Sequence, residues 1–444
     1  MYTIMAIIFV IGYILIALEH KLHIDKSAPA LLTGVICWVL LVLDGQDILS
    51  DKILHGNHDL SFINHYINEH LYEHLSEISG ILFFLLGAMT IVELIDSYGG
   101  FNIITSHIKT TKKIHLIWIL SILTFFLSAA LDNLTTSIVM ATLLKKLIPD
   151  KEDLWFFAGI IIIAANAGGA WSPIGDVTTI MLWIGGKVSA SNIVVKVFIP
   201  SIMALIVPLI IISFSMKGHV GERKEESKDL EKETKAKPFE QKLIFYLGIG
   251  LLLFVPIFKT ITHLPPFMGI LFGLGVLWFL TEILNDRRKY GYGRLSVVGV
   301  LTKIDVPSVL FFLGILLAVA ALQTAGHLEE LATFMDDAIG NIYMINVIIG
   351  LLSSIVDNVP LVAGAMGMYS IDVYPQDHIF WELLTYCAGT GGSALIIGSA
   401  AGVAVMGILK INFIWYMKKI SWLAIVGYFA GVLTFYLQDL IFHF

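Results

Sequence analysis

Charged residues are scarce in this 444-residue chain. Asp, Glu, Lys and Arg make up 14% of it, against 57% hydrophobic residues, and the mean hydropathy is +0.84. Soluble domains average roughly 25% charged residues, so this chain could not cover its apolar side chains in water. The composition excludes a soluble globular protein and predicts a polytopic membrane protein. The net charge of −7 says little about partners, because charges in such a protein are sorted by membrane side.

Cysteine is also rare, and the N-terminal residues do not have the pattern expected of a signal peptide. Only Cys37 and Cys387 are present, in separate apolar runs, which excludes a disulfide framework and a cysteine metal site. The apolar start, Met1 to Leu18, lacks a basic beginning and a small-residue cleavage site. It is therefore interpreted as a first membrane span and not as a signal peptide.

Apolar runs long enough for a bilayer, which needs about 20 helical residues, recur along the chain. Lys217 to Lys237 interrupts them with a run of mixed charge, predicted to be a solvated linker. The predicted spans are residues 3–18, 28–44, 78–96, 152–186, 193–214, 242–258, 264–282, 306–323, 379–409 and 420–440.

Two further apolar segments, residues 115–147 and 341–371, each carry an Asp-Asn pair. These pairs are Asp132-Asn133 and Asp357-Asn358. An ionisable side chain at such depth costs at least about 2.5–3.5 kcal/mol, so it is expected to face the protein interior or water. Two such pairs in matching halves of the chain predict a site.

The lysines and arginines indicate how these two segments enter the membrane. Lys109, Lys112 and Lys113 precede the first segment, and Lys145, Lys146 and Lys151 follow it. Both clusters stay on the cytoplasmic side only if the segment dips in and returns. From residue 304 to residue 409 there is no Lys or Arg, which fits a second re-entrant segment that enters from outside. Two hairpins that enter from opposite faces are typical of an inverted repeat.

An internal duplication agrees with that topology. Glu77 aligns with Asp305, Asp132-Asn133 with Asp357-Asn358, and the run from Asn166 to Asp176 with the run from Gly389 to Ser399. The predicted organisation is N-terminal spans with an external His-rich segment (1–76), repeat 1 with a hairpin and a broken helix (77–216), the cytoplasmic linker (217–241), two scaffold spans with a cytoplasmic loop (242–304), and the inverted repeat 2 with the last span (305–444). The predicted fold class is an all-α inverted-repeat transporter with two re-entrant hairpins and two discontinuous transmembrane helices.

Glycine and proline are expected to break both long spans of the repeats. Gly168-Gly169 and Pro173 should interrupt the first, and the run Gly389 to Ser393 the second. Freed backbone carbonyls beside carboxylates and hydroxyls suit a hard cation such as Na⁺ or Li⁺. The alternative is that these glycines only allow tight helix packing.

The charge of the predicted core favours a cation as cargo. Asp132, Asp176 and Asp357 lie deep, and no deep position is predicted to hold Lys or Arg. An anion carrier would need cationic groups, helix N-termini or neutral donors there. One carboxylate can hold a proton or a metal cation but not both, which is the simplest form of exchange. The alternative role for these acids is helix capping.

Neutral ligands and a proton path complete the predicted site, and no resident cofactor is expected. Glu77 and Asp305 are candidates for proton entry, although carboxylates at a membrane edge are usually only solvated. The candidate substrate ligands are Asp132, Asn133, Thr135, Asn166, Asp176, Thr178, Thr179, Ser353, Asp357, Asn358 and Ser393, with the three aspartates as the ligands of transported Na⁺.

Two enzyme patterns are set aside. His70-Leu-Tyr-Glu-His74 matches a zinc-protease string, but no soluble catalytic domain surrounds it, and pH sensing or an external amphipathic helix is the alternative. An intramembrane aspartyl protease needs Gly-x-Gly-Asp, and Pro173-Ile-Gly-Asp176 lacks the first glycine. We therefore expect a transporter and not an enzyme.

The long motifs resemble those of the NhaD-type sodium/proton antiporters. The resemblance covers about residues 77 to 410 and rests on Leu131-Asp-Asn-Leu-Thr-Thr136, Asn166-Ala-Gly-Gly-Ala-Trp-Ser-Pro-Ile-Gly-Asp-Val-Thr-Thr179, Leu310-Phe-Phe-Leu-Gly-Ile-Leu-Leu-Ala318 and Ser353-Ser-Ile-Val-Asp-Asn-Val-Pro360. The wider superfamily includes arsenite and dicarboxylate carriers, and the latter carry Ser-Asn-Thr at their hairpin tips.

This resemblance implies exchange of cytoplasmic Na⁺ or Li⁺ for external H⁺ by alternating access in a bacterial inner membrane. It also implies a homodimer with a moving transport domain. An anion carrier for arsenite or dicarboxylate is the alternative. The Asp-Asn tips at Asp132 and Asp357, in place of Ser-Asn-Thr, favour cations.

Overall fold

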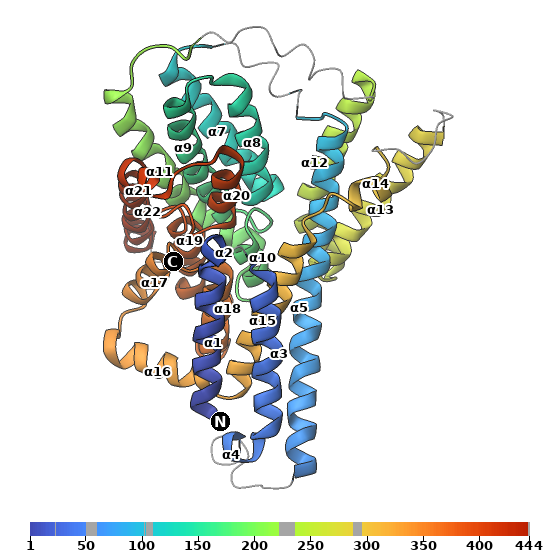
Figure 1. Ribbon diagram of the computed structural model, residues 1–444, viewed down its shortest axis with the longest axis vertical. Coiled ribbons are helices and arrows are strands. Elements are labelled where there is room, and N and C mark those ends of the chain that lie inside the picture. The colour runs from blue at the N-terminus through green and yellow to red at the C-terminus, as the bar shows by residue number, and fades with distance from the viewer. Residues whose placement is uncertain are drawn as a thin grey trace.

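The chain is described by a computed structural model for residues 1–22, 24–49, 60–101, 103, 110–221, 236–286 and 295–442. Within these ranges its regular structure is helical, apart from one isolated bridge between Lys112 and His219 (Figure 1). Eight of the helices described are long and apolar enough to cross a bilayer, and ten if each of two sharply bent pairs counts as one span. The predicted all-α polytopic membrane fold is confirmed.

The helices follow the predicted apolar runs closely, because each run ends at a polar, glycine or proline cluster. Their bounds are α1 (Tyr2–Ala17), α2 (Glu19–Leu22), α3 (Ser27–Leu43), α4 (Gly45–Leu49), α5 (Leu60–Ser97), α7 (Lys113–Leu131), α8 (Asn133–Leu147), α9 (Lys151–Ala170), α10 (Val177–Ile184), α11 (Ala190–Ser215), α12 (Pro238–Thr262), α13 (Pro266–Asp286), α14 (Val297–Leu301), α15 (Val306–Thr324), α16 (His327–Ile339), α17 (Ile342–Leu352), α18 (Asn358–Met368), α19 (Ile379–Gly391), α20 (Ala400–Leu409), α21 (Phe413–Lys419) and α22 (Ser421–Phe442).

Helix α5 differs from its prediction, because it begins at residue 60 and not near residue 78. Ile63 and Ile67 are buried in its first turns, and both line the contact with Gly45 on α4. No glycine or proline lies between Leu60 and Gly80, so the His-rich part of α5 continues as one helix into the span. The predicted domain boundary at residues 76/77 therefore falls inside a continuous helix.

Several charged segments used in the topology prediction lie outside the described residues. They are Lys109, linker residues 222–235 and the arginine-rich loop at 287–294, together with His55 and His58 of the His-rich segment.

The chain reverses at the first Asp-Asn pair. Lys113 at the start of α7 pairs with Asp153 in the first turn of α9, with Nζ 2.6 Å from Oδ2. Helix α9 begins only four residues after α8 ends. The start of α7 and the end of α8 therefore lie at the same end of the molecule. The turn is Asp132 itself, whose φ of 100° is rare for a residue with a side chain.

The second Asp-Asn pair also sits at a reversal. Tyr369 directly follows α18, and its hydroxyl donates to Asp336 Oδ1 at 2.9 Å. Asp336 lies near the end of α16, just before α17 begins. Helices α17 and α18 therefore form a second hairpin, with Asp357 at its tip.

The two broken helices run in opposite directions. Trp155 at the start of α9 donates from Nε1 to the carbonyl of Leu409 at the end of α20, at 3.1 Å. At the other end, Asp377 before α19 donates from its backbone N–H to the carbonyl of Lys187 after α10, at 2.9 Å. The pair α9–α10 and the pair α19–α20 therefore lie antiparallel.

The same contacts recur in the two halves. Ser128 Oγ donates to the Ala165 carbonyl at 2.6 Å, and Ser353 Oγ donates to the Ala388 carbonyl at 3.0 Å. Each of these hydroxyls lies four residues before its hairpin aspartate and fixes the hairpin to the following broken helix. The same contact therefore anchors each of the two hairpins.

The glycine prediction was partly wrong. Gly168 and Gly169 lie inside α9, and the helix is broken only at residues 171–176, around Pro173. In the second half α19 continues to Gly391, and the break is at residues 392–399. A Cβ on Gly168 would lie 2.2 Å from the Phe125 carbonyl oxygen. Gly168 therefore allows close helix packing, the alternative considered for these glycines, whereas Gly169 lies against the backbone of Gly175 in the break.

The helices form two groups (Figure 1). The scaffold group consists of α1, α3, α5, α12, α13 and α15, and the hairpin group consists of α7–α11 and α17–α22. The groups meet where α15 packs on α18, α5 on α10, and α12 on α7. Both Asp-Asn tips belong to the hairpin group.

Candidate ion-binding site

A small cavity lies where the two hairpin tips meet the first helix break. Its volume of about 30 Å³ is enough for a water molecule or a small ion. The three predicted carboxylates, distant in sequence, all line it. Its lining residues are Leu85, Met89, Asp132, Asn133, Leu134, Thr135, Asp176, Val177, Ser308, Phe312, Asp357, Asn358, Val359 and Ala400.

Asp132 caps helix α8. Its Oδ1 accepts the backbone N–H of Thr135 at 2.7 Å, and its Oδ2 accepts the Thr135 hydroxyl at 2.8 Å. Each carboxylate oxygen has two acceptor sites, so these bonds leave capacity free toward the cavity. Asp132 is therefore a helix cap, which is the alternative role predicted for these acids, and it also lines the cavity.

Asp176 is the most enclosed of the three acids, with 1% of its surface exposed. It caps α10 by accepting the backbone N–H and the hydroxyl of Thr178, at 2.8 and 2.6 Å. Asn133 Nδ2 donates to its other oxygen, and Asn358 Nδ2 lies 3.4 Å from Oδ1. The Asp176 carboxylate therefore accepts hydrogen bonds from the side-chain amides of both hairpin tips.

Asp357 has a basic neighbour, which corrects the prediction that no lysine or arginine lies deep in the site. Lys26 Nζ is 3.4 Å from Asp357 Oδ2, and both side chains are largely covered. Lys26 lies between two apolar runs and directly precedes α3, so its sequence position indicates the membrane edge. Only the tertiary contact between α3 and the second hairpin reveals its role.

Asn166 joins the two halves behind the carboxylates. Its Nδ2 donates to the hydroxyls of Ser393 and Ser399, at 2.9 and 3.0 Å, and its Oδ1 accepts Asn133 Nδ2 at 3.1 Å. Asn166 and Ser393, both predicted ligands, are thus brought together, but neither of them lines the cavity. Asn166 contacts Asn133, which does line it.

Two other predicted ligands bond to backbone carbonyls away from the cavity lining. Ser353 donates to Ala388 as described above, and Thr179 Oγ1 lies 3.5 Å from the Ala170 carbonyl. Thr179 thereby bridges the first helix break.

The two candidates for proton entry are placed differently. Asp305 is exposed, caps α15, and accepts the hydroxyl of Ser308, which itself lines the cavity. Glu77 is exposed on α5, near His74, and does not line the cavity. Ser308 is a connecting residue that sequence reasoning missed, although its position three residues after Asp305 is typical of a capped helix start.

Four helices begin at the cavity. Asp132, Asp176 and Asp357 cap α8, α10 and α18, and Ser399 caps α20, whose first residue Ala400 lines the cavity. Helix N-termini attract anions. The sequence argument against an anion carrier is therefore incomplete, because it rested on the lack of Lys and Arg and these N-termini supply partial positive charge.

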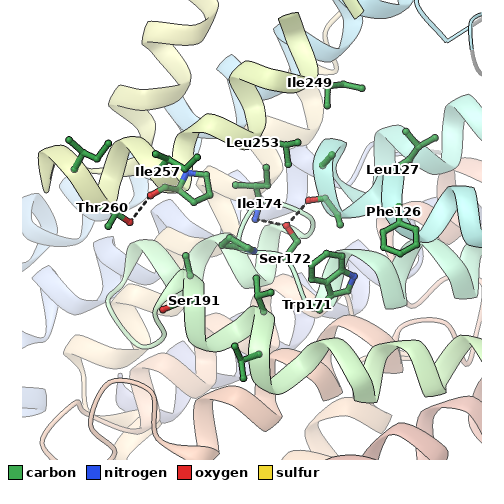
Figure 2. Close-up of a pocket in the computed structure, with 18 of the residues that line it drawn as sticks. Phe126, Leu127, Trp171, Ser172, Ile174, Ser191, Ile249, Leu253, Ile257 and Thr260 are labelled. Atoms are coloured by element: carbon green, nitrogen blue, oxygen red, sulfur yellow. Dashed lines mark hydrogen bonds between the residues drawn. The ribbon is translucent and has the colours of Figure 1, made fainter. Parts of the chain in front are cut away.

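A second and larger cavity of about 890 Å³ lies on the other side of the first break (Figure 2). Trp171, Ser172 and Ile174 of the break face Phe126 of α7 and Leu253 and Ile257 of α12 across it. The Ser172 hydroxyl is turned to the Ala129 carbonyl. Because its walls are almost wholly apolar, this cavity is not suited to bind a bare ion.

The fold and the acidic cavity at its broken helices define a polytopic membrane transporter. A family model described as "Citrate transporter" matches residues 13–384. "Sodium/proton antiporter 1" of Arabidopsis thaliana is 46% identical over 435 residues, covering 97% of this chain and 71% of that protein. "Sodium/proton antiporter 2" of the same plant is 44% identical over 434 residues, covering 97% and 98%. "Na(+)/H(+) antiporter NhaD" of Alkalimonas amylolytica is 30% identical over 455 residues, covering 96% and 88%.

The chain belongs to the NhaD-type sodium/proton antiporters, within the family whose model carries the citrate-transporter description. It is a multi-pass membrane transporter and not an enzyme.

Proposed function

We propose that the protein exchanges Na⁺ or Li⁺ for H⁺ across a membrane by alternating access. The observation that carries this proposal is that Asp132, Asp176 and Asp357 line one small cavity, brought there by two hairpin tips and a helix break. Carboxylate, amide and hydroxyl oxygens are the ligands that hard cations prefer. The printed names of the relatives support the same cargo.

The exchange follows from competition for these carboxylates. Na⁺ from the cytoplasm binds among Asp132, Asp357 and Asp176, with Asn133, Asn358 and Thr135 as neutral ligands in the lining. When the site faces outward, protons displace the cation, since an oxygen that holds a proton no longer attracts Na⁺. Protons reach the cavity through Asp305 and Ser308, which join the surface to the cavity.

The proposed topology is an inverted repeat with two re-entrant hairpins. The antiparallel broken helices and the two chain reversals support it. A homodimer and a bacterial inner-membrane location are proposed from the family resemblance alone.

The test is a ΔpH assay with the purified protein in vesicles. Addition of Na⁺ or Li⁺ should collapse a preformed ΔpH, and Asp132→Asn and Asp357→Asn should each abolish the response. Asp153→Asn is the matched control, because Asp153 pairs with Lys113 away from the cavity and exchange should persist. Normal exchange in both cavity variants would rule out the shared-carboxylate mechanism.

An anion carrier is the second candidate, favoured by the four helix N-termini and by the family description. The same vesicles distinguish the two. A ΔpH that responds to citrate, a dicarboxylate or arsenite, and not to Na⁺ or Li⁺ alone, would replace the first proposal with the second.

A further inference from the structure

Lys26 lies beside the cavity, and contacts of its own side chain and of its neighbour Ser27 fix its position. Ser27 donates its hydroxyl to the Pro307 carbonyl at 2.6 Å, which fixes the start of α3 to the start of α15. The ammonium group then lies 4.3 Å from the centre of the Phe311 ring and 3.4 Å from Asp357 Oδ2. The Phe311 ring and the Asp357 carboxylate both attract the ammonium group, and together they fix its position.

The position of Lys26 makes it a cation beside a cation site. Asp357 belongs to the second hairpin, whereas Lys26 belongs to the scaffold group, so the ion pair joins the two groups. The ammonium interacts with an acid that also lines the proposed Na⁺ cavity. Two positive charges at one carboxylate repel each other strongly in a partly buried site.

We propose that Lys26 is a tethered competitor, whose ammonium group occupies Asp357 when Na⁺ is absent and must leave it when Na⁺ binds. This inference rests on the proposed exchange of Na⁺ for H⁺. Lys26 acts here only through its contact with Asp357. Its effect is to keep Asp357 paired in the empty site and to lower the affinity for Na⁺, which makes it a residue that sets cargo affinity.

The experiment compares Lys26→Met with Lys26→Arg in reconstituted vesicles at one fixed pH. Lys26→Met removes the competitor, so the KM for Na⁺ should fall about fivefold or more, the lower end of usual couplings between ligands. Lys26→Arg retains the charge and should keep a KM near that of the unmodified protein. Lys113→Met removes a similar ion pair away from the cavity and should leave KM unchanged.

A binding measurement covers the case in which Lys26→Met does not transport. Na⁺ stabilises a protein to which it binds, so the Na⁺ concentration at half of the maximal Tm shift reports affinity. This concentration should fall in Lys26→Met and not in Lys26→Arg.

Two results would overturn the assignment of Lys26. One is a Lys26→Met variant with an unchanged or higher KM and an unchanged midpoint of the Tm shift. The other is an equal effect of Lys26→Arg and Lys26→Met. Both leave the exchange function standing. Failure of the unmodified protein to respond to Na⁺ or Li⁺ would instead end the proposed function, and this inference with it.

Discussion

Asn166 connects the two halves through one side chain. Its amide bonds to Ser393 and Ser399 of the second half and to Asn133 of the first hairpin, and Asn133 in turn donates to Asp176. These groups are all buried. A buried polar network of this kind is stable only while every member keeps its partners.

Asn166→Ala should therefore lower both stability and exchange. Leaving buried partners without their bonds costs about 1–3 kcal/mol, and Asn133 would lose the contact that orients it toward Asp176. Thermal unfolding in detergent and the vesicle ΔpH assay measure the two effects. Asn346→Ala is the control, because Asn346 is equally buried and, among the residues that the structure describes, its Nδ2 donates to Ile342 of its own helix alone. Equal losses in both variants would contradict a special role for Asn166.

For single residues, the sequence predicts the three aspartates of the site but not Lys26. Asp132, Asp176 and Asp357 stand out because a carboxylate within an apolar run needs an explanation. Lys26 does not stand out, because a lysine at the edge of a span is ordinary. No local pattern shows that α3 starts beside the tip of a hairpin more than 300 residues away along the chain.

Glycine contacts join each hairpin to its broken helix. Gly168 of α9 meets the backbone of Phe125 on α7, and Gly391 of α19 meets the backbone of Gly350 on α17. An added Cβ would lie 2.2 and 1.9 Å from the respective carbonyl oxygens. Backbone atoms cannot rotate away as the end of a flexible side chain can. These contacts therefore require the absence of a side chain.

Gly168→Ala and Gly391→Ala should separate the hairpin from the broken helix and impair exchange. Overpacking of this kind costs about 1–3 kcal/mol, and Tm together with the yield of folded protein reports it. Gly364→Ala, on α18, is the matched control, since nothing lies within 4 Å of its added Cβ. A tolerated Gly168→Ala with full exchange would show that the helices can move apart without loss.

The element scale also shows why the breaks were misplaced by a few residues. Gly168-Gly169 favours irregular backbone as much as it favours close packing, and the sequence alone does not distinguish these roles. Pro173 favours the break more strongly, because it lacks a backbone N–H and disfavours regular helix, although Pro200, Pro208 and Pro256 are accommodated inside α11 and α12. The helix accordingly ends at Ala170, just before the proline.

In the whole molecule, the hairpin group and the scaffold group meet over a limited boundary. The 890 Å³ apolar cavity lies on it, between α7 and the first break on one side and α12 on the other (Figure 2). Alternating access needs one group to move against the other, so motion at this boundary should be essential.

Cross-linking tests that expectation. Cysteines placed at Phe126 and Leu253, on opposite walls of the cavity, should stop exchange when joined by a bifunctional thiol reagent, and an uncrosslinked sample should retain it. Cysteines at Trp118 and Ser213, whose side chains are hydrogen-bonded within the hairpin group, should be joined without loss. The background replaces Cys37 and Cys387, both buried. Full exchange by the protein joined across the cavity would show that transport does not need this boundary to open.

The four helix starts at the cavity carry a further consequence. Each N-terminus contributes roughly half a positive charge, so α8, α10, α18 and α20 together with Lys26 offset part of the negative charge that the three aspartates can carry. The helix backbone around the site thus carries partial positive charge, and the sign of its cargo is decided by the residues that cap the helices. Exchange of those acids for hydroxyls, as at Ser399, would turn the same architecture toward anions, which agrees with the citrate-transporter description of the family to which this chain belongs.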